Sequence, residues 1–97
     1  MTDPVISNVR PHVWNSEQSV AYEAAIEAIN GVVAAYSALI AEAENPPVSQ
    51  ELITEYRTLR TECQQVRKAL RAEDTENVAR VRAAYAAKLR ELTETGA

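Results

Sequence analysis

Few side chains in this chain of 97 residues belong to the types that carry out reactions, and their spacing assembles no reactive site. His12 is the only histidine, and no aspartate, glutamate or cysteine lies within four residues of it. We therefore interpret His12 as a surface or packing side chain rather than as a general base or a metal ligand. Glu23 and Glu27 lie one helical turn apart, but ferritin-like metal sites also need Glu-x-x-His pairs, and none is present. We predict no metal and no cofactor, and we expect the two glutamates to form a solvated acidic face.

The other residues with reactive potential also fit a packing role better. Cys63 is the only cysteine, which excludes an internal disulfide and a cysteine-based zinc cluster within one chain. It falls between Leu59 and Val66 in an apolar stripe, a position that predicts a buried, unreactive thiol. The two glycines, Gly31 and Gly96, are too few for a phosphate-binding loop. The sequence thus offers no catalytic residue, and we predict that the protein is not an enzyme.

The composition is that of a small folded domain with a thin core. The chain is 46% hydrophobic but contains 17 alanines and no phenylalanine, so each buried residue removes little apolar area from water. A charged fraction of 25% and a net charge of -4 indicate a folded acidic chain rather than a disordered or globally basic one. The acidic start fits no secretory signal, and the uncharged run over residues 28–41 is short for a membrane span. We expect a cytoplasmic protein, and the arginine-rich, alanine-rich usage suggests a bacterial source.

Capping signals and proline positions divide the chain into an arm and one helical domain. Two prolines predict an extended N-terminal arm over residues 1–15, followed by a single helical domain over residues 16–97. The helices are predicted at about residues 16–44, 49–72 and 75–94. Asn45-Pro46-Pro47 ends the first helix, Ser49 caps the second and Asp74 caps the third. Because no glycine or proline enforces the second break, one kinked helix in place of the last two is the alternative.

The first predicted helix is apolar around more than half of its circumference, so we expect neighbours on two sides. Its large apolar residues are Tyr22, Ile26, Ile29, Val33, Tyr36 and Ile40. Roughly opposite lies a small-residue stripe, which we define as Ala24, Ala28, Gly31, Ala35 and Ala38. A glycine in mid-helix costs about 1 kcal/mol relative to alanine, so close packing against another helix would explain it. The occupant would be either the small row Ala79, Ala83 and Ala86 of the third helix or the same stripe of a second copy; alternatively, the alanines merely favour helix. We predict a two-fold homodimer with this stripe at the interface.

The second predicted helix carries a basic row, which we define as Arg57, Arg60, Gln64, Arg67, Lys68 and Arg71. Like charges one turn apart repel each other, so an anionic partner across from the row would be favourable. The acidic side of the first helix, an acidic protein and a nucleic-acid backbone are the candidates, and a merely solvated basic face is the alternative. Because the row lacks aromatic residues and the chain is acidic, we do not expect nucleic acid as the main partner.

These observations predict an all-α fold: a long antiparallel helical hairpin plus a third helix in a three-helix bundle, with an extended arm. We expect this unit to dimerise into a larger helical bundle. The predicted function is that of a non-catalytic helical interaction protein, a small regulator, adaptor or inhibitor that acts by protein–protein contact. The alternative is a dimeric nucleic-acid-associated regulator that uses the basic face of the second helix.

Overall fold

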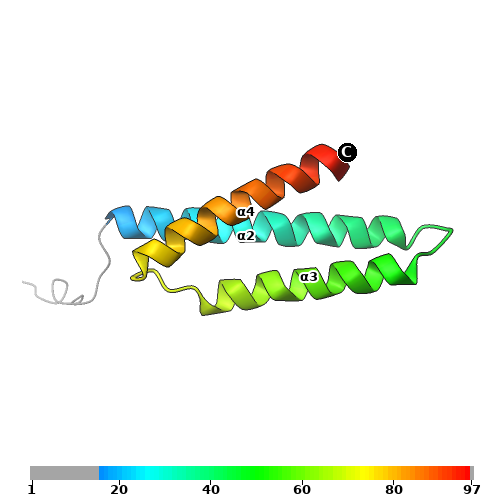
Figure 1. The fold of residues 1–97 in the computed structure, drawn as a ribbon, viewed down its shortest axis with the longest axis horizontal. Helices are drawn as coiled ribbons and strands as arrows, with labels where there is room; N and C mark the ends of the chain where they lie inside the picture. Colours follow the sequence, from blue (N-terminus) through cyan, green and yellow to red (C-terminus); the bar gives the residue numbers. More distant parts are fainter. Residues whose placement is uncertain (1–15, 97) are drawn as a thin grey trace, which may run out of the picture.

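The computed structural model describes residues 16–96, which form three α-helices (Figure 1). The helices are α2 (Ser16–Ala43), α3 (Gln50–Ala69) and α4 (Thr75–Gly96). They take up 86% of the described residues, and no strand occurs among these residues. The all-α prediction is therefore confirmed, and the last two helices are separate. The predicted arm over residues 1–15, with His12, lies outside the described part of the chain.

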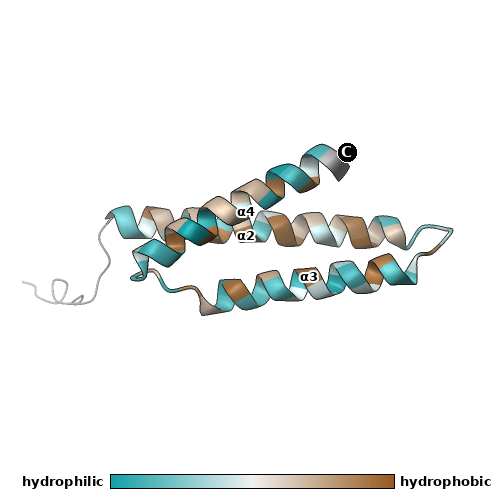
Figure 2. Cartoon of the chain, in the orientation of Figure 1, coloured by the Kyte–Doolittle hydropathy of each residue, from teal (hydrophilic) through white to brown (hydrophobic). Residues whose placement is uncertain are grey.

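Helix α2 is the centre of the fold, with α3 packed along one side and α4 along another (Figure 1). No Cα atom of α3 lies within 8 Å of a Cα atom of α4, so the backbones of the two outer helices do not pack directly on each other. Helix α3 runs antiparallel to α2, and α4 crosses α2 at an angle and diverges toward its own C-terminus (Figure 1). Figure 2 shows hydrophobic residues along much of α2, whereas α3 is mainly hydrophilic. The two neighbours expected for the first helix are thus both supplied by the same chain.

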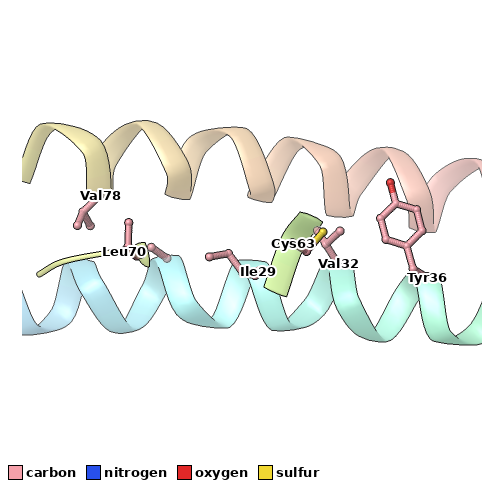
Figure 3. Packing of buried hydrophobic residues seen from close by; sticks show 7 residues of the cluster. Ile29, Val32, Tyr36, Cys63, Leu70 and Val78 are labelled. Atoms are coloured by element: carbon pink, nitrogen blue, oxygen red, sulfur yellow. The ribbon is translucent and has the colours of Figure 1, made fainter. Parts of the chain in front are cut away.

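The core lies on the face of α2 that points between α3 and α4. Its α2 residues recur every three or four positions, the spacing that keeps side chains on one face of a helix. The buried cluster consists of Ala25, Ile29, Val32, Tyr36, Cys63, Leu70 and Val78. Figure 3 shows these side chains between α2 and α4, with Cys63 entering from α3.

Two predicted caps fix the starts of α3 and α4. Ser49 has an extended backbone (φ -114°, ψ 95°), and its hydroxyl oxygen accepts a hydrogen bond from the Leu52 amide at 3.3 Å. The Asp74 carboxylate accepts one from the Asn77 amide at the same distance. Each cap pairs an amide that the first turn of a helix leaves without a partner. The Ser49 amide in turn donates to the Ala43 carbonyl at 3.0 Å and closes the turn between α2 and α3.

Helix α3 ends at Ala69, about three residues before the predicted end near residue 72. Leu70 has an extended backbone (φ -71°, ψ 135°), and Leu70 and Ala72 are both buried. Residues two apart on a helix point about 200° away from each other, so a continuous helix would have exposed one of these two side chains. Leaving the helix at Leu70 lets both of them enter the core, and apolar spacing alone did not predict this.

Helix α2 is long and apolar enough, by length and composition alone, to cross a membrane. The central helix of a bundle has a similar composition, because neighbours cover more than one of its faces. Here α3 and α4 cover α2 from two sides, and Glu23 and Glu27 lie exposed along it.

Candidate interaction site

The small-residue stripe of α2 is occupied by α4 at its centre. A Cβ atom placed on Gly31 would lie 2.7 Å from the Cδ2 atom of Leu89, which is closer than two non-bonded carbon atoms approach each other in proteins. The other members of the stripe are half-buried, except Ala38, which is exposed. Of the two occupants considered from the sequence, α4 of the same chain is therefore the one that covers Gly31.

The contact between α2 and α4 uses a large side chain rather than a second small row. Leu89 lies over Gly31, whereas Ala79 and Ala83 are exposed and Ala86 is half-buried. Packing of the third helix of the same chain on Gly31 is therefore observed, but the residue of α4 that contacts the glycine is the bulky Leu89 rather than an alanine of the small row.

Two arginines of the basic row form hydrogen bonds with side chains of α2. Arg60 donates a hydrogen bond from Nη1 to the Ser37 hydroxyl at 3.0 Å, and Arg67 donates one to the Asn30 side-chain carbonyl. Both arginines are half-buried. Arg60 and Arg67 are seven residues apart on α3, and their partners Ser37 and Asn30 are seven residues apart on α2. The two hydrogen bonds therefore hold the antiparallel α2 and α3 in a single register.

The rest of the basic row is exposed, and Arg71 lies beyond α3, which ends at Ala69 rather than near residue 72, so the row does not follow the helix as far as predicted. Arg71 pairs with Glu73 at 3.3 Å, an exposed ion pair that contributes little to stability. Arg57, Gln64 and Lys68 are also exposed. The row is thus divided: two members join α3 to α2, and four remain on the surface.

A cavity of about 210 Å³ opens between the three helices near the middle of α2. Its lining comes from all three helices: Val32, Tyr36, Leu59, Glu62, Cys63, Ala84, Tyr85 and Lys88. Figure 3 shows the Tyr36 hydroxyl directed from α2 toward α4. The Tyr36 ring also stacks with that of Tyr56, which lines no part of this cavity, at a centroid distance of 6.1 Å and an interplanar angle of 29°. The cavity exists because α3 and α4 both pack on α2 without packing their backbones on each other.

Burial favours the neutral forms of the thiol and of the two tyrosine hydroxyls in this cavity. Burial raises the pKa of the Cys63 thiol, which is also hydrogen-bonded with the Tyr85 side chain. Burial likewise raises the pKa values of the Tyr36 and Tyr85 hydroxyls. A neutral thiol is a poor nucleophile, so this environment suits packing rather than covalent chemistry.

Charged side chains near the cavity form an ion pair, and they form no metal site in the described part of the chain. Lys88 pairs with Glu91 at 3.3 Å, and this interaction raises the pKa of its ammonium group. Among residues 16–96, no three histidine, cysteine, aspartate or glutamate side chains gather closely enough to hold a metal ion.

A second hollow lies at the turn end of the α2–α3 hairpin, and we call it the tip hollow. It has a volume of about 350 Å³ and is lined by Leu39, Glu42, Ala43, Asn45, Pro46, Pro47, Ser49, Leu52 and Tyr56. Helix α4 diverges from α2 and ends before it reaches this turn, so among residues 16–96 no third helix covers the hollow (Figure 1). Leu52 is accordingly 41% exposed and neighbouring Val48 is 53% exposed.

Burial decreases toward the hairpin tip along the apolar seam of α3, which we define as Leu52, Tyr56, Leu59, Cys63, Val66 and Leu70. Leu70 and Cys63 are buried, and Val66 between them is half-buried. Leu59 and Tyr56 are half-buried, and Leu52 at the tip is exposed. At the tip, Ile53 beside Leu52 is buried at 2% exposure, so it is the side of α3 that carries Leu52 that stays open there.

The sequence did not predict the tip hollow, although Asn45, Pro46, Pro47 and Ser49 had marked the turn where it lies. The signal that would have indicated it is a mismatch in length, since α2 has 28 residues and α4 only 22. Comparisons with protein-family models, with curated proteins and with solved structures found no match to this chain. The geometry of the described residues therefore carries the functional argument.

Proposed function

We propose that this chain is a non-catalytic helical interaction protein, a small regulator, adaptor or inhibitor that acts by protein–protein contact. The observation that carries the proposal is the tip hollow, where the seam of α3 runs on beyond the end of α4. A hollow that combines leucine, tyrosine and proline side chains with exposed Leu52 suits a helix from a partner. The proposal includes self-association into a larger helical bundle and a cytoplasmic location.

The chemistry of the central cavity supports a binding role over an enzymatic one. Its thiol and hydroxyl groups are held neutral, and its walls are mainly apolar. The basic row supports the nucleic-acid alternative less than its sequence suggested, because Arg60 and Arg67 donate to side chains of α2. The exposed remainder is small and carries no aromatic residue for base stacking.

Site-specific photo-crosslinking tests this function. A photoreactive phenylalanine analogue replaces Leu52 in the tip hollow, and in a matched control it replaces Thr61, which is exposed on the opposite face of α3. In cells that express the chain, we expect protein adducts from position 52 and few from position 61. Equal adduct formation at both positions, or none at position 52, would contradict the proposal. Binding to nucleic acid that weakens steeply in salt would favour the alternative.

A further inference from the structure

We propose that the tip hollow binds α4 of a second copy of this chain in a two-fold pair, an inference that rests on the proposed function. The part of α4 involved is its outer strip, which we define as Arg80, Ala83, Ala87 and Arg90. This interface differs from the small-residue stripe of α2, where Leu89 of the same chain already covers Gly31.

The tip hollow is apolar inside and acidic at its edges. Leu39, Leu52 and Tyr56 supply apolar surface, and Glu42 contributes to the lining. Glu55 lies three residues after Leu52 and four before Leu59, which places it beside the seam on α3. Residues 38–56 contain four glutamates and no lysine or arginine, so the whole hairpin tip is negatively charged.

The outer strip of α4 carries small side chains at its centre and basic side chains beside them. Its four residues are spaced three, four and three apart, so they share one face of the helix, and all of them are exposed. This face lies opposite the one that carries Val78, Tyr85 and Leu89 into the core. Two alanines at its centre let bulky side chains approach closely, and two arginines flank them. Residues 78–90 contain four basic residues and no acidic one, and Glu76 and Glu94 continue the same face beyond the two ends of the strip.

The orientation of the pair follows from these charges. A tip-to-tip pair would bring two clusters of four glutamates together, and like charges across an interface are strongly unfavourable. In an antiparallel pair, each acidic tip meets the basic outer strip of the other copy instead. Because every chain carries both surfaces, the same contact forms twice and the assembly closes as a dimer. Each α4 then lies between its own α2 and the hairpin tip of the other copy.

Charge reversal on each surface, followed by mixing, tests this pairing. The tip variant combines Glu42→Arg with Glu55→Arg, and the strip variant combines Arg80→Glu with Arg90→Glu. All four residues are exposed, and the one side-chain bond affected, from Arg80 to Asn77, lies on the surface of α4, so both variants should keep the helical spectrum. In a homodimer of either variant both contacts become repulsive, whereas in the mixed dimer both contacts join opposite charges.

Light scattering measures the mass of each assembly in solution. We expect the wild type to weigh about twice the 10.7 kDa chain mass and each variant to weigh one chain mass. Self-association of each variant should be at least about 100-fold weaker than that of the wild type, and an equimolar mixture should recover the dimer mass. High salt should weaken the wild-type dimer, because the screening length falls from about 10 Å at 0.1 M to about 3 Å at 1 M.

Matched controls reverse two charges of the same sign at exposed positions outside the two proposed surfaces. Arg57→Glu with Lys68→Glu reverses two exposed bases on α3, and Glu23→Arg with Glu27→Arg reverses two exposed acids on α2; both should leave the dimer intact. A monomeric wild type, variants that dimerise like the wild type, or a mixture that stays monomeric would each overturn the inference. The proposed function would still stand if position 52 crosslinked to a different protein, and it would fall if that position crosslinked to nothing.

Discussion

Gly31→Leu tests the packing of α4 on α2. A Cβ atom at position 31 would already lie 2.7 Å from Leu89, and leucine adds three further carbon atoms in the same direction. Overpacking of this kind costs about 1–3 kcal/mol. Replacing a glycine in mid-helix regains about 1 kcal/mol of helix propensity. Since the contact is already too close at the first carbon, we take the upper end of the cost and expect a net loss of about 2 kcal/mol.

Urea denaturation and thermal melting, both followed by circular dichroism, measure this loss. A change of about 1 kcal/mol lowers the Tm of a domain of this size by about 4–8 °C, so a drop of about 8–16 °C is expected. Ala34→Leu is the matched control, because Ala34 is exposed on α2 and should change stability by less than about 0.5 kcal/mol. Combining Gly31→Leu with Leu89→Ala exchanges the large and small side chains and should recover part of the loss. A Gly31→Leu protein as stable as the wild type would refute the contact with Leu89.

Three further predictions concern the thiol, the basic row and alkaline pH. Cys63 is buried, so a thiol reagent should label it slowly in the native protein and promptly in denaturant; rapid native labelling would contradict its burial. Arg60→Glu with Arg67→Glu should lower the free energy of unfolding by about 1–3 kcal/mol, because two side-chain hydrogen bonds to α2 are lost. Reversing Arg57 alone should change it by less than about 0.5 kcal/mol, and equal effects would contradict the division of the row. Burial raises the pKa values of Cys63 and Tyr85, so the unfolded chain loses these protons first and stability should fall as pH rises above their ordinary values of 9.0 and 10.0; a melting temperature that is constant across that range would contradict this.

Local signals predicted the helices well because each signal acts over a few residues. The caps at Ser49 and Asp74 and the two prolines after Asn45 determine where helices start and stop, and each operates within one turn. The apolar circumference of the first helix correctly predicted neighbours on two sides. The end of α3 was placed too late because the burial of both Leu70 and Ala72 depends on tertiary packing rather than on helix periodicity.

The partners of each surface were harder to predict, because they depend on the path of α4. A stripe centred on Gly31 fits a helix of the same chain or of another one equally well, and only the position of Leu89 distinguishes them. Similarly, an arginine at position 60 or 67 has the same local sequence whether it faces solvent or an α2 side chain. The tip hollow depends on where α4 diverges and ends, which is determined by its crossing angle and length together.

The most direct test of the interaction account is the accessibility of position 52 in the presence of a second copy. Leu52→Cys is introduced together with Cys63→Ala, so the new thiol is the only one in the chain. A small amount of this protein is treated with a thiol reagent while the Cys63→Ala chain is added in increasing excess. The added chain keeps Leu52 and has no thiol that could compete for the reagent. Thr61→Cys in the same Cys63→Ala background is the control. We expect labelling at position 52 to slow at least about tenfold as the second copy covers the hollow, while labelling at position 61 stays constant. A labelling rate at position 52 that is independent of added chain would contradict it.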